Sequence, residues 1–237
     1  KNYDVTIDPG HGGMDGGGAS GNYKETDFTM DISKKVKSNL EKAGITVKLT
    51  HDEGDIDKNH VMDEYNKGGR AVIPNEVKSK YTFSIHINKS GSSKVKGIEV
   101  YTPSDINYDL VKDIVNNITN NTSLGYSSNR LYKKFDGIYT HNFTESEVKS
   151  AIDGYDKKNY KHYNVTTNSN YLYMIRETGG FMTGAYVDSS NPDKVGVNPY
   201  YDSNIGNESY LLELGYISNS TDVNTLKEEQ DALAKAI

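Results

Sequence analysis

Short runs with a two-residue hydrophobic period alternate along this chain with longer stretches of helical period. The short apolar runs predict six β-strands, at residues 3–7, 45–49, 81–88, 97–101, 171–176 and 209–214. Between them, apolar residues recur every three or four positions and predict helices beginning at 26 or 27, within 70–79, at 109–120 and at 222–237. Strands and helices therefore follow one another in βαβ order, which favours parallel pairing.

This order predicts the fold class. We expect an α/β protein with one domain, built on a mostly parallel, twisted sheet of about six strands flanked by helices. Apart from the run at 171–176, regular patterns fade between residues 125 and 206, where Tyr, Asn, Lys and Gly are frequent. Segments of this length are usually functional or mobile. We therefore predict one domain over residues 1–237, with a long irregular Tyr/Asn-rich insertion at 125–206.

Composition narrows the classes of partner. The net charge is −6 and no long basic cluster occurs, which argues against a nucleic-acid partner. No run approaches 18 apolar residues, so no membrane span is predicted. The chain has no cysteine, so a metal site must use histidine and carboxylate ligands. Because the chain begins at Lys1 rather than Met, we expect a module of a longer exported protein.

Two histidines and one glutamate stand where a metal site could form. His11 follows the first predicted strand among glycines that leave its imidazole accessible, and Glu25 precedes the first predicted helix. His86 lies on the polar face of strand 81–88, near its C-terminal end, where ligands bind in open α/β sheets. Such a set leaves a fourth tetrahedral position for water, as in catalytic zinc sites. A single histidine taken alone is more often structural.

Glu213 is the other informative residue, because it interrupts the apolar run YLLEL at 210–214. A carboxylate there is costly to bury unless it is paired or functional. Burial would raise its pKa toward the range useful for proton transfer. The alternative is a structural ion pair with Arg176, one of three arginines in the chain.

The other histidines give weaker signals. His51, at the end of the second predicted strand, could approach the site as a group outside the ligand set. The remaining three lie in polar stretches and are expected to be solvated: His60, His141 and His162.

Four motifs occur in order along the chain: IDPGHGG at 7–13, Glu25, SIHIN at 84–88 and LELGYISN at 212–219. Together they resemble the zinc-dependent N-acetylmuramoyl-L-alanine amidases of the Amidase_3 family. The similarity runs from residue 3 to the final helix. Two features depart from the family pattern, since His51 stands where arginine is common and the segment 125–206 is longer than in minimal members.

The resemblance implies a role for each candidate residue. His11, Glu25 and His86 would hold one Zn²⁺, and Glu213 would act as the general base and acid. Two weaker candidates for binding substrate amide or carboxylate groups are Asn88 and Arg176, for which a structural hydrogen bond or ion pair is the alternative.

The resemblance also implies a substrate and a location. The expected reaction is hydrolysis of the amide between the lactyl group of N-acetylmuramic acid and L-alanine in peptidoglycan. The protein would act as a secreted, cell-wall enzyme of a bacterium. We expect a monomer, with any wall-anchoring modules outside this chain.

Two other functions remain open at this point. A metallopeptidase or deacetylase could use the same His/His/Glu chemistry on another bond of the wall. A wall-binding module could retain the site in vestigial form and use its many tyrosines to stack on sugars. The presence of all four residues of the expected site argues against the second alternative.

Overall fold

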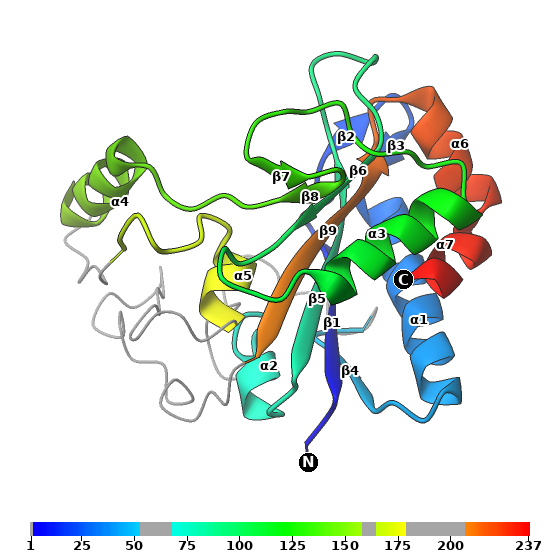
Figure 1. Cartoon of the computed structure of the whole chain (residues 1–237), viewed down its shortest axis with the longest axis horizontal. Coiled ribbons are helices and arrows are strands. Elements are labelled where there is room, and N and C mark those ends of the chain that lie inside the picture. Colours follow the sequence, from blue (N-terminus) through cyan, green and yellow to red (C-terminus); the bar gives the residue numbers. More distant parts are fainter. Residues whose placement is uncertain (1, 53–67, 158–164, 179–206) are drawn as a thin grey trace.

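A seven-stranded sheet forms the centre of the protein (Figure 1). This computed structural model describes residues 2–52, 68–157, 165–178 and 207–237. From edge to edge the strands are β4 (Val47–Leu49), β1 (Val5–Pro9), β5 (Tyr81–Asn88), β9 (Glu208–Tyr216), β6 (Ile98–Tyr101), β8 (Ile138–Tyr139) and β7 (Lys133–Phe135). Neighbours from β4 to β9 are parallel, whereas β6 is antiparallel to β9 and β7 to β8. A hairpin of β2 (Ala19–Ser20) and β3 (Tyr23–Lys24) lies outside this sheet.

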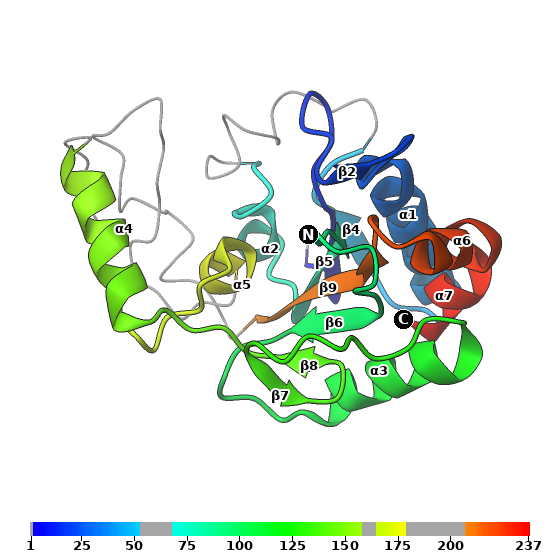
Figure 2. The same ribbon diagram turned by 90° about the horizontal axis from the view of Figure 1, so that it is seen from above.

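Helices lie on both sides of the sheet (Figure 2). One side carries α1 (Thr26–Lys42), α3 (Asp109–Asn121), α6 (Ser220–Glu228) and α7 (Gln230–Ala236). The other side carries α2 (Ile73–Glu76) and α5 (Tyr173–Thr178), while α4 (Glu145–Lys157) stands apart from the sheet. Helix α1 packs on β1, β4 and β5, and α7 contacts both α1 and α3. No helix in the described residues has the length and apolar character that crossing a membrane requires.

Alternation along the strands separates an apolar face from a polar face. In β5, Phe83, Ile85 and Ile87 join the hydrophobic core with residues of α1, as the period of two predicts. The residues between them point the other way, so His86 lies on the opposite face. The same alternation places Glu213 of β9 on that face, because Leu212 and Leu214 belong to the core. The polar face therefore collects the groups from which a site can be built.

The predicted fold class is confirmed, with a mostly parallel sheet of seven strands rather than about six. One predicted strand is wrong, because residues 171–176 fall largely in helix α5. The N–H of Arg176 donates to the carbonyl oxygen of Leu172 (3.0 Å), and every residue from Met174 to Thr178 is buried. A short segment buried on all sides shows no helical period, so its pattern cannot be distinguished from that of a buried strand.

The segment 125–206 is more regular than its sequence predicts. Its described parts include the edge strands β7 and β8 and the helices α4 and α5. The predicted C-terminal helix is divided into α6 and α7 at Glu229, whose φ of −114° departs from helical values. The side chain of Asn219 caps α6 by accepting from the N–H of Asp222 (3.0 Å), so this helix begins before the predicted residue 222.

Asp222 ties the start of α6 to the sheet. Its Oδ2 accepts hydrogen bonds from the backbone N–H groups of Gly97 (2.8 Å) and Tyr216 (2.9 Å), and the residue is 2% exposed. Asp222→Ala leaves both buried donors unpaired, so we expect the free energy of unfolding to fall by about 2–4 kcal/mol in chemical denaturation. Asp231→Ala is the control, because Asp231 is exposed in its ion pair with Lys35 and should cost less than about 1 kcal/mol. Equal losses for the two variants would contradict this assignment.

Candidate metal centre

The loop after β1 places His11 at the carboxyl end of the sheet. Gly10 approaches β5 so closely that an added Cβ would lie 2.5 Å from the carbonyl oxygen of Ile85 and 2.6 Å from Cε1 of His86. His11 adopts a φ of 58°, in the left-handed region that non-glycine residues seldom occupy. Backbone strain of this kind is found preferentially at functional sites. The missing side chain of Gly10 lets the two histidines come together.

Glu25 reaches the same point from the N-cap of α1 and is 4% exposed. Its Oε2 accepts from the N–H of Gly18 (3.0 Å) and its Oε1 from the N–H of Ile87 (2.9 Å). Gly17 has a φ of 69°, and an added Cβ there would lie 2.7 Å from Glu25 Oε2 and 2.6 Å from Cδ2 of His11. The glycine-rich loop therefore fits closely around both side chains. Glu25 occupies the N-cap position without a side-chain cap bond, and the helix begins at Thr26, one of the two predicted starts.

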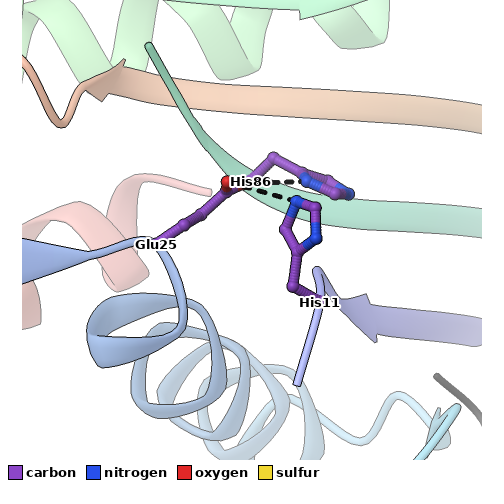
Figure 3. A group of neighbouring side chains, drawn as sticks. All are labelled: His11, Glu25 and His86. Carbon is purple, nitrogen blue, oxygen red and sulfur yellow. Dashed lines mark hydrogen bonds and ion pairs between the residues drawn. The ribbon is translucent and has the colours of Figure 1, made fainter. Parts of the chain in front are cut away.

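His86 completes the cluster (Figure 3). Its Nδ1 lies 2.9 Å from Oε1 of Glu25, and Nε2 of His11 lies 3.1 Å from Oε2 of the same carboxylate. The two imidazole rings are 4.9 Å apart and nearly perpendicular, at 83°. One candidate ligand atom from each of the three residues lies within 4.8 Å of the others. The structure thus brings together the three residues that the sequence places in three separate segments.

The charges in the cluster favour a cation. Burial alone would raise the pKa of Glu25, but hydrogen bonds and charge from His11 and His86 hold it far below its usual value. Burial would lower the pKa of His11, but Glu25 and Asp15 raise it to about 9. The buried carboxylate therefore stabilises positive charge at the point where the two rings meet.

Each histidine also has a partner on its other ring nitrogen. Nδ1 of His11 lies 2.7 Å from Oδ2 of Asp15, and Nε2 of His86 lies 3.1 Å from Oγ of Ser84. Because Ser84 donates its hydroxyl proton to Asp8 (2.6 Å), it accepts from His86. These outer partners accept the outer ring N–H groups. When the inner nitrogens lose their protons to a metal, their lone pairs therefore point into the cluster, as in metal-ligating histidines.

Asp8 anchors this second layer of contacts. It is fully buried, and burial alone would raise its pKa, but the Arg70 guanidinium leads the interactions that hold it below its usual value. Arg70 Nε lies 3.4 Å from Asp8, and Arg70 Nη2 donates to the carbonyl oxygen of His11 (2.8 Å). Thr50 bonds both Asp8 (2.7 Å) and Nδ1 of His51 (3.0 Å). The structure therefore places His51 beside Asp8 and outside the ligand set.

Glu213 adjoins the cluster on the polar face. In the sheet register it lies opposite His86 of β5 and opposite Glu99 of β6, so the three side chains form one row. Its Oε2 is inaccessible to solvent and has no hydrogen-bond partner among the described residues. Burial, reinforced by the charges of Glu25 and Glu99, raises the pKa of Glu213 well above its usual value. Such a carboxyl group is suited to proton transfer.

Comparison of the chain with known protein families identifies its relatives. The model of the family Amidase_3, N-acetylmuramoyl-L-alanine amidase, matches residues 5–237. The chain belongs to this family. The match includes all four motifs and confirms the resemblance that they predict.

Individual relatives match parts of this Amidase_3 chain. A germination-specific N-acetylmuramoyl-L-alanine amidase of Bacillus subtilis is 29% identical over 147 residues, which cover 57% of this chain and 59% of the relative. An endolysin of Bacillus phage SPP1 is 38% identical over 98 residues, covering 41% of this chain and 32% of the relative. Less than two thirds of each relative is therefore matched. Among solved structures, N-acetylmuramoyl-L-alanine amidase AmiC2 of Nostoc punctiforme has a TM-score of 0.60 at 26% identity, over 98% of this chain and 91% of that one.

The donor set of this Amidase_3 domain fits a catalytic zinc ion. Two imidazole nitrogens and one carboxylate oxygen are ordinary zinc ligands, and three protein ligands leave a position for water. The outer partners Asp15 and Ser84 orient the two rings as zinc-bound histidines require. Gly17 packs so closely against Glu25 and His11 that a side chain at position 17 would clash with both.

Arg176 does not pair with Glu213 within the described residues. Its Nε lies 3.3 Å from Oε1 of Glu177, and its Nη1 donates to the carbonyl oxygens of Asn170 (2.8 Å) and Tyr171 (2.9 Å). Arg176 is 6% exposed. These contacts favour a structural role, and substrate binding by Arg176 stays a prediction.

His141 differs from the solvated residue that its sequence predicts. It is 9% exposed and stacked between the rings of Tyr132 (3.7 Å) and Tyr171 (4.3 Å), with Nε2 3.2 Å from Glu147. Aromatic neighbours that are distant in sequence bury it, and its local pattern gives no sign of them. His60 and His162 lie outside the described residues.

Sequence reasoning missed four residues that surround the cluster: Asp8, Asp15, Ser84 and Glu99. Two of them carry a local signal. Asp15 follows His11 by four residues within the same glycine-rich loop, and Glu99 interrupts an apolar strand in the same way as Glu213. Asp8 and Ser84 become informative only when β1 and β5 pair and bring them opposite one another.

Proposed function

We propose that this protein is a zinc-dependent amidase that hydrolyses the bond between the lactyl group of N-acetylmuramic acid and L-alanine in peptidoglycan. The observation that carries the proposal is the convergence of His11, Glu25 and His86 within 4.8 Å, beside the buried carboxyl group of Glu213, in an Amidase_3 chain. The three ligands would hold one Zn²⁺, with His11 contributing Nε2 and His86 contributing Nδ1.

When bound, the zinc would act as a Lewis acid toward the amide carbonyl and would lower the pKa of a water molecule. Glu213 takes a proton from the attacking water, whose oxygen bonds to the carbonyl carbon. Glu213 then gives that proton to the alanine nitrogen as the C–N bond breaks, because an amide anion would be a very poor leaving group. The products are the lactyl carboxylate and a free alanine amine.

The surroundings of Glu213 support both steps. Its burial and the neighbouring negative charges favour the protonated form, so the carboxyl group holds a proton long enough to deliver it. Oε2 makes no hydrogen bond in the described residues, so no side chain among them competes for the proton that this carboxyl group carries. Asn88, two residues beyond His86 on the same strand, is a candidate for holding a substrate amide.

The substrate determines the place of action. Peptidoglycan lies outside the cytoplasm, so we propose that the protein is exported and works in a bacterial cell wall. We further propose that it acts as a monomer and that any modules anchoring it to the wall lie outside this chain.

End-group analysis of purified peptidoglycan tests the proposal. We expect new N-terminal alanine without new reducing sugar ends, abolished by a chelator and restored by zinc. New amines on other residues would identify a peptidase, and release of acetate would identify a deacetylase. Either of these results, or the absence of cleavage with zinc present, would overturn the amidase assignment.

Asp15 provides a test of the metal site that does not depend on turnover. Because Asp15 orients His11 through Nδ1, Asp15→Ala should weaken zinc binding by about 10–100-fold while the protein remains folded. Competition with a chromophoric chelator measures the dissociation constant. Asp113→Ala, on the exposed surface of α3, is the matched control and should bind zinc as the wild type does. Unchanged affinity in Asp15→Ala would remove this carboxylate from the site.

A further inference from the structure

A polar pocket of about 400 Å³ opens at Asn88, two residues beyond the candidate ligand His86 on β5. Its lining includes six residues with polar side chains that bear on ligand binding: Asn88, Lys89, Glu99, Tyr101, Asn129 and Tyr216. It adjoins the reacting groups, since Asn88 follows His86 on β5 and Glu99 lies opposite Glu213 in the sheet. Lys89 lies between the pocket and the loop around Glu25. A Cβ added to Gly18 in that loop would lie 3.4 Å from Cβ of Lys89.

Glu99 forms the floor of this pocket and is fully buried. Its carboxylate accepts hydrogen bonds from five side chains: Ser127 Oγ (2.7 Å), Tyr101 OH (2.8 Å), Asn129 Nδ2 (3.3 Å), Asn88 Nδ2 (3.4 Å) and Tyr216 OH. No lysine or arginine of the described chain forms an ion pair with it. A buried carboxyl group without a cation is costly unless it is hydrogen-bonded, and these five donors satisfy it. With its lone pairs occupied, Glu99 orients the lining groups instead of binding a ligand itself.

The donors and acceptors of the lining that are not used in hydrogen bonds within the protein define what the pocket can bind. The side-chain carbonyl of Asn88 accepts from the N–H of Lys89 (2.8 Å), and that of Asn129 accepts from the N–H of Leu131 (3.0 Å). Each amide gives one N–H to Glu99 and keeps the other. The hydroxyl of Tyr101 donates to Glu99 and keeps its lone pairs. Apart from the ammonium group of the exposed Lys89, the lining therefore offers two N–H donors and one oxygen acceptor, with a tyrosine ring beside them.

We propose that this pocket binds a secondary amide of the substrate next to the bond that is cleaved. A secondary amide has one carbonyl acceptor and one N–H donor, which match the two asparagines and Tyr101. In peptidoglycan this chemistry has two sources, the acetamido group of an amino sugar and the peptide bonds of the stem. The inference rests on the proposed amidase activity.

The test compares Asn129→Ala with the wild type on two substrates, peptidoglycan before and after chemical removal of its N-acetyl groups. The release of N-terminal alanine measures cleavage. If the acetamido group occupies the pocket, Asn129→Ala should lower kcat/KM by about 3–10-fold on acetylated substrate, as one lost hydrogen bond predicts. On deacetylated substrate the same variant should match the wild type. If a stem peptide bond occupies it, the deficit should instead persist after deacetylation and disappear for soluble muramoyl peptides whose stem is shortened to L-alanine.

Two further variants separate binding from damage to the fold. Tyr101→Phe keeps the ring and removes the hydroxyl, so it should show the same substrate dependence as Asn129→Ala. Asn117→Ala, exposed on α3, should match the wild type on every substrate. A deficit of equal size on all substrates, or no deficit, would overturn the pocket assignment. Failure of the wild type to release alanine from any substrate would overturn the amidase proposal instead.

Discussion

Glu213→Gln should lower kcat by about 10²–10⁴-fold while zinc remains bound, because that is the usual contribution of a positioned general acid–base group. Glutamine keeps the volume of the side chain but cannot carry a proton between water and the leaving nitrogen. Because Glu213 is outside the expected ligand set, metal content should be unchanged. Initial rates of alanine release at saturating substrate, together with zinc analysis of the same samples, measure both quantities.

Glu208→Gln is the matched control for this substitution. Glu208 lies at the start of the same strand, five residues from Glu213, and accepts a hydrogen bond from Tyr210. It is remote from the carboxyl end of the sheet, so its kcat should be close to that of the wild type. Turnover near the wild-type value in Glu213→Gln would exclude Glu213 as the proton carrier.

The burial of Glu213 also predicts that Glu213→Gln changes how the free energy of unfolding depends on pH. The folded-state pKa of Glu213 is raised, so ionisation of this carboxyl opposes folding once the pH exceeds its unfolded value near 4.5. Glutamine does not ionise. In chelator-treated protein, Glu213→Gln should therefore be at least as stable as the wild type, with an advantage that grows as the pH rises. Denaturation at several pH values measures it, and an advantage that shrinks with rising pH would contradict the burial of this charge.

His86→Ala should abolish zinc binding and, with it, alanine release. The substitution removes one of three protein ligands and leaves Oε1 of Glu25 without its side-chain partner. Two remaining ligands do not make the three-ligand set of a catalytic zinc site. Metal analysis after dialysis, with circular dichroism to verify the fold, measures the loss.

His141→Ala separates this effect from the general removal of a histidine. His141 is stacked between two tyrosines in the segment 125–206, and it is outside the candidate metal cluster of the described residues. Its zinc content should equal that of the wild type. Stoichiometric zinc in His86→Ala would remove His86 from the ligand set and would require another residue in its place.

Local pattern predicts much of this fold because most strands here alternate strictly. The bounds predicted for β5 agree with the structure, since Phe83, Ile85 and Ile87 face the core and His86 does not. Helix α1 follows its four-residue period and ends before Gly44, whose φ of 85° suits the position after a helix. The candidate ligands were predictable for a related reason, because polar residues at the carboxyl ends of parallel strands meet at one edge.

Other features of the structure cannot be predicted from the local sequence pattern. The helix at α5 is buried on all sides, so its sequence lacks the polar face that would reveal a helical period. Stacking of His141 depends on Tyr132 and Tyr171, which are 39 residues apart in the chain. The edge strand β8 likewise depends on pairing with β6, which lies earlier in the sequence.

The sequence by itself determined the strand faces, the metal ligand candidates and the position of Glu213, because each follows from a local pattern: alternation along a strand, a glycine-rich loop or the start of a helix. The tertiary structure decided the order β5-β9-β6, and with it the row formed by His86, Glu213 and Glu99. That row exists because the last strand of the chain inserts between two earlier ones. Strand order depends on packing and pairing across more than a hundred residues, and the local alternation of any one strand is the same whichever neighbours it acquires.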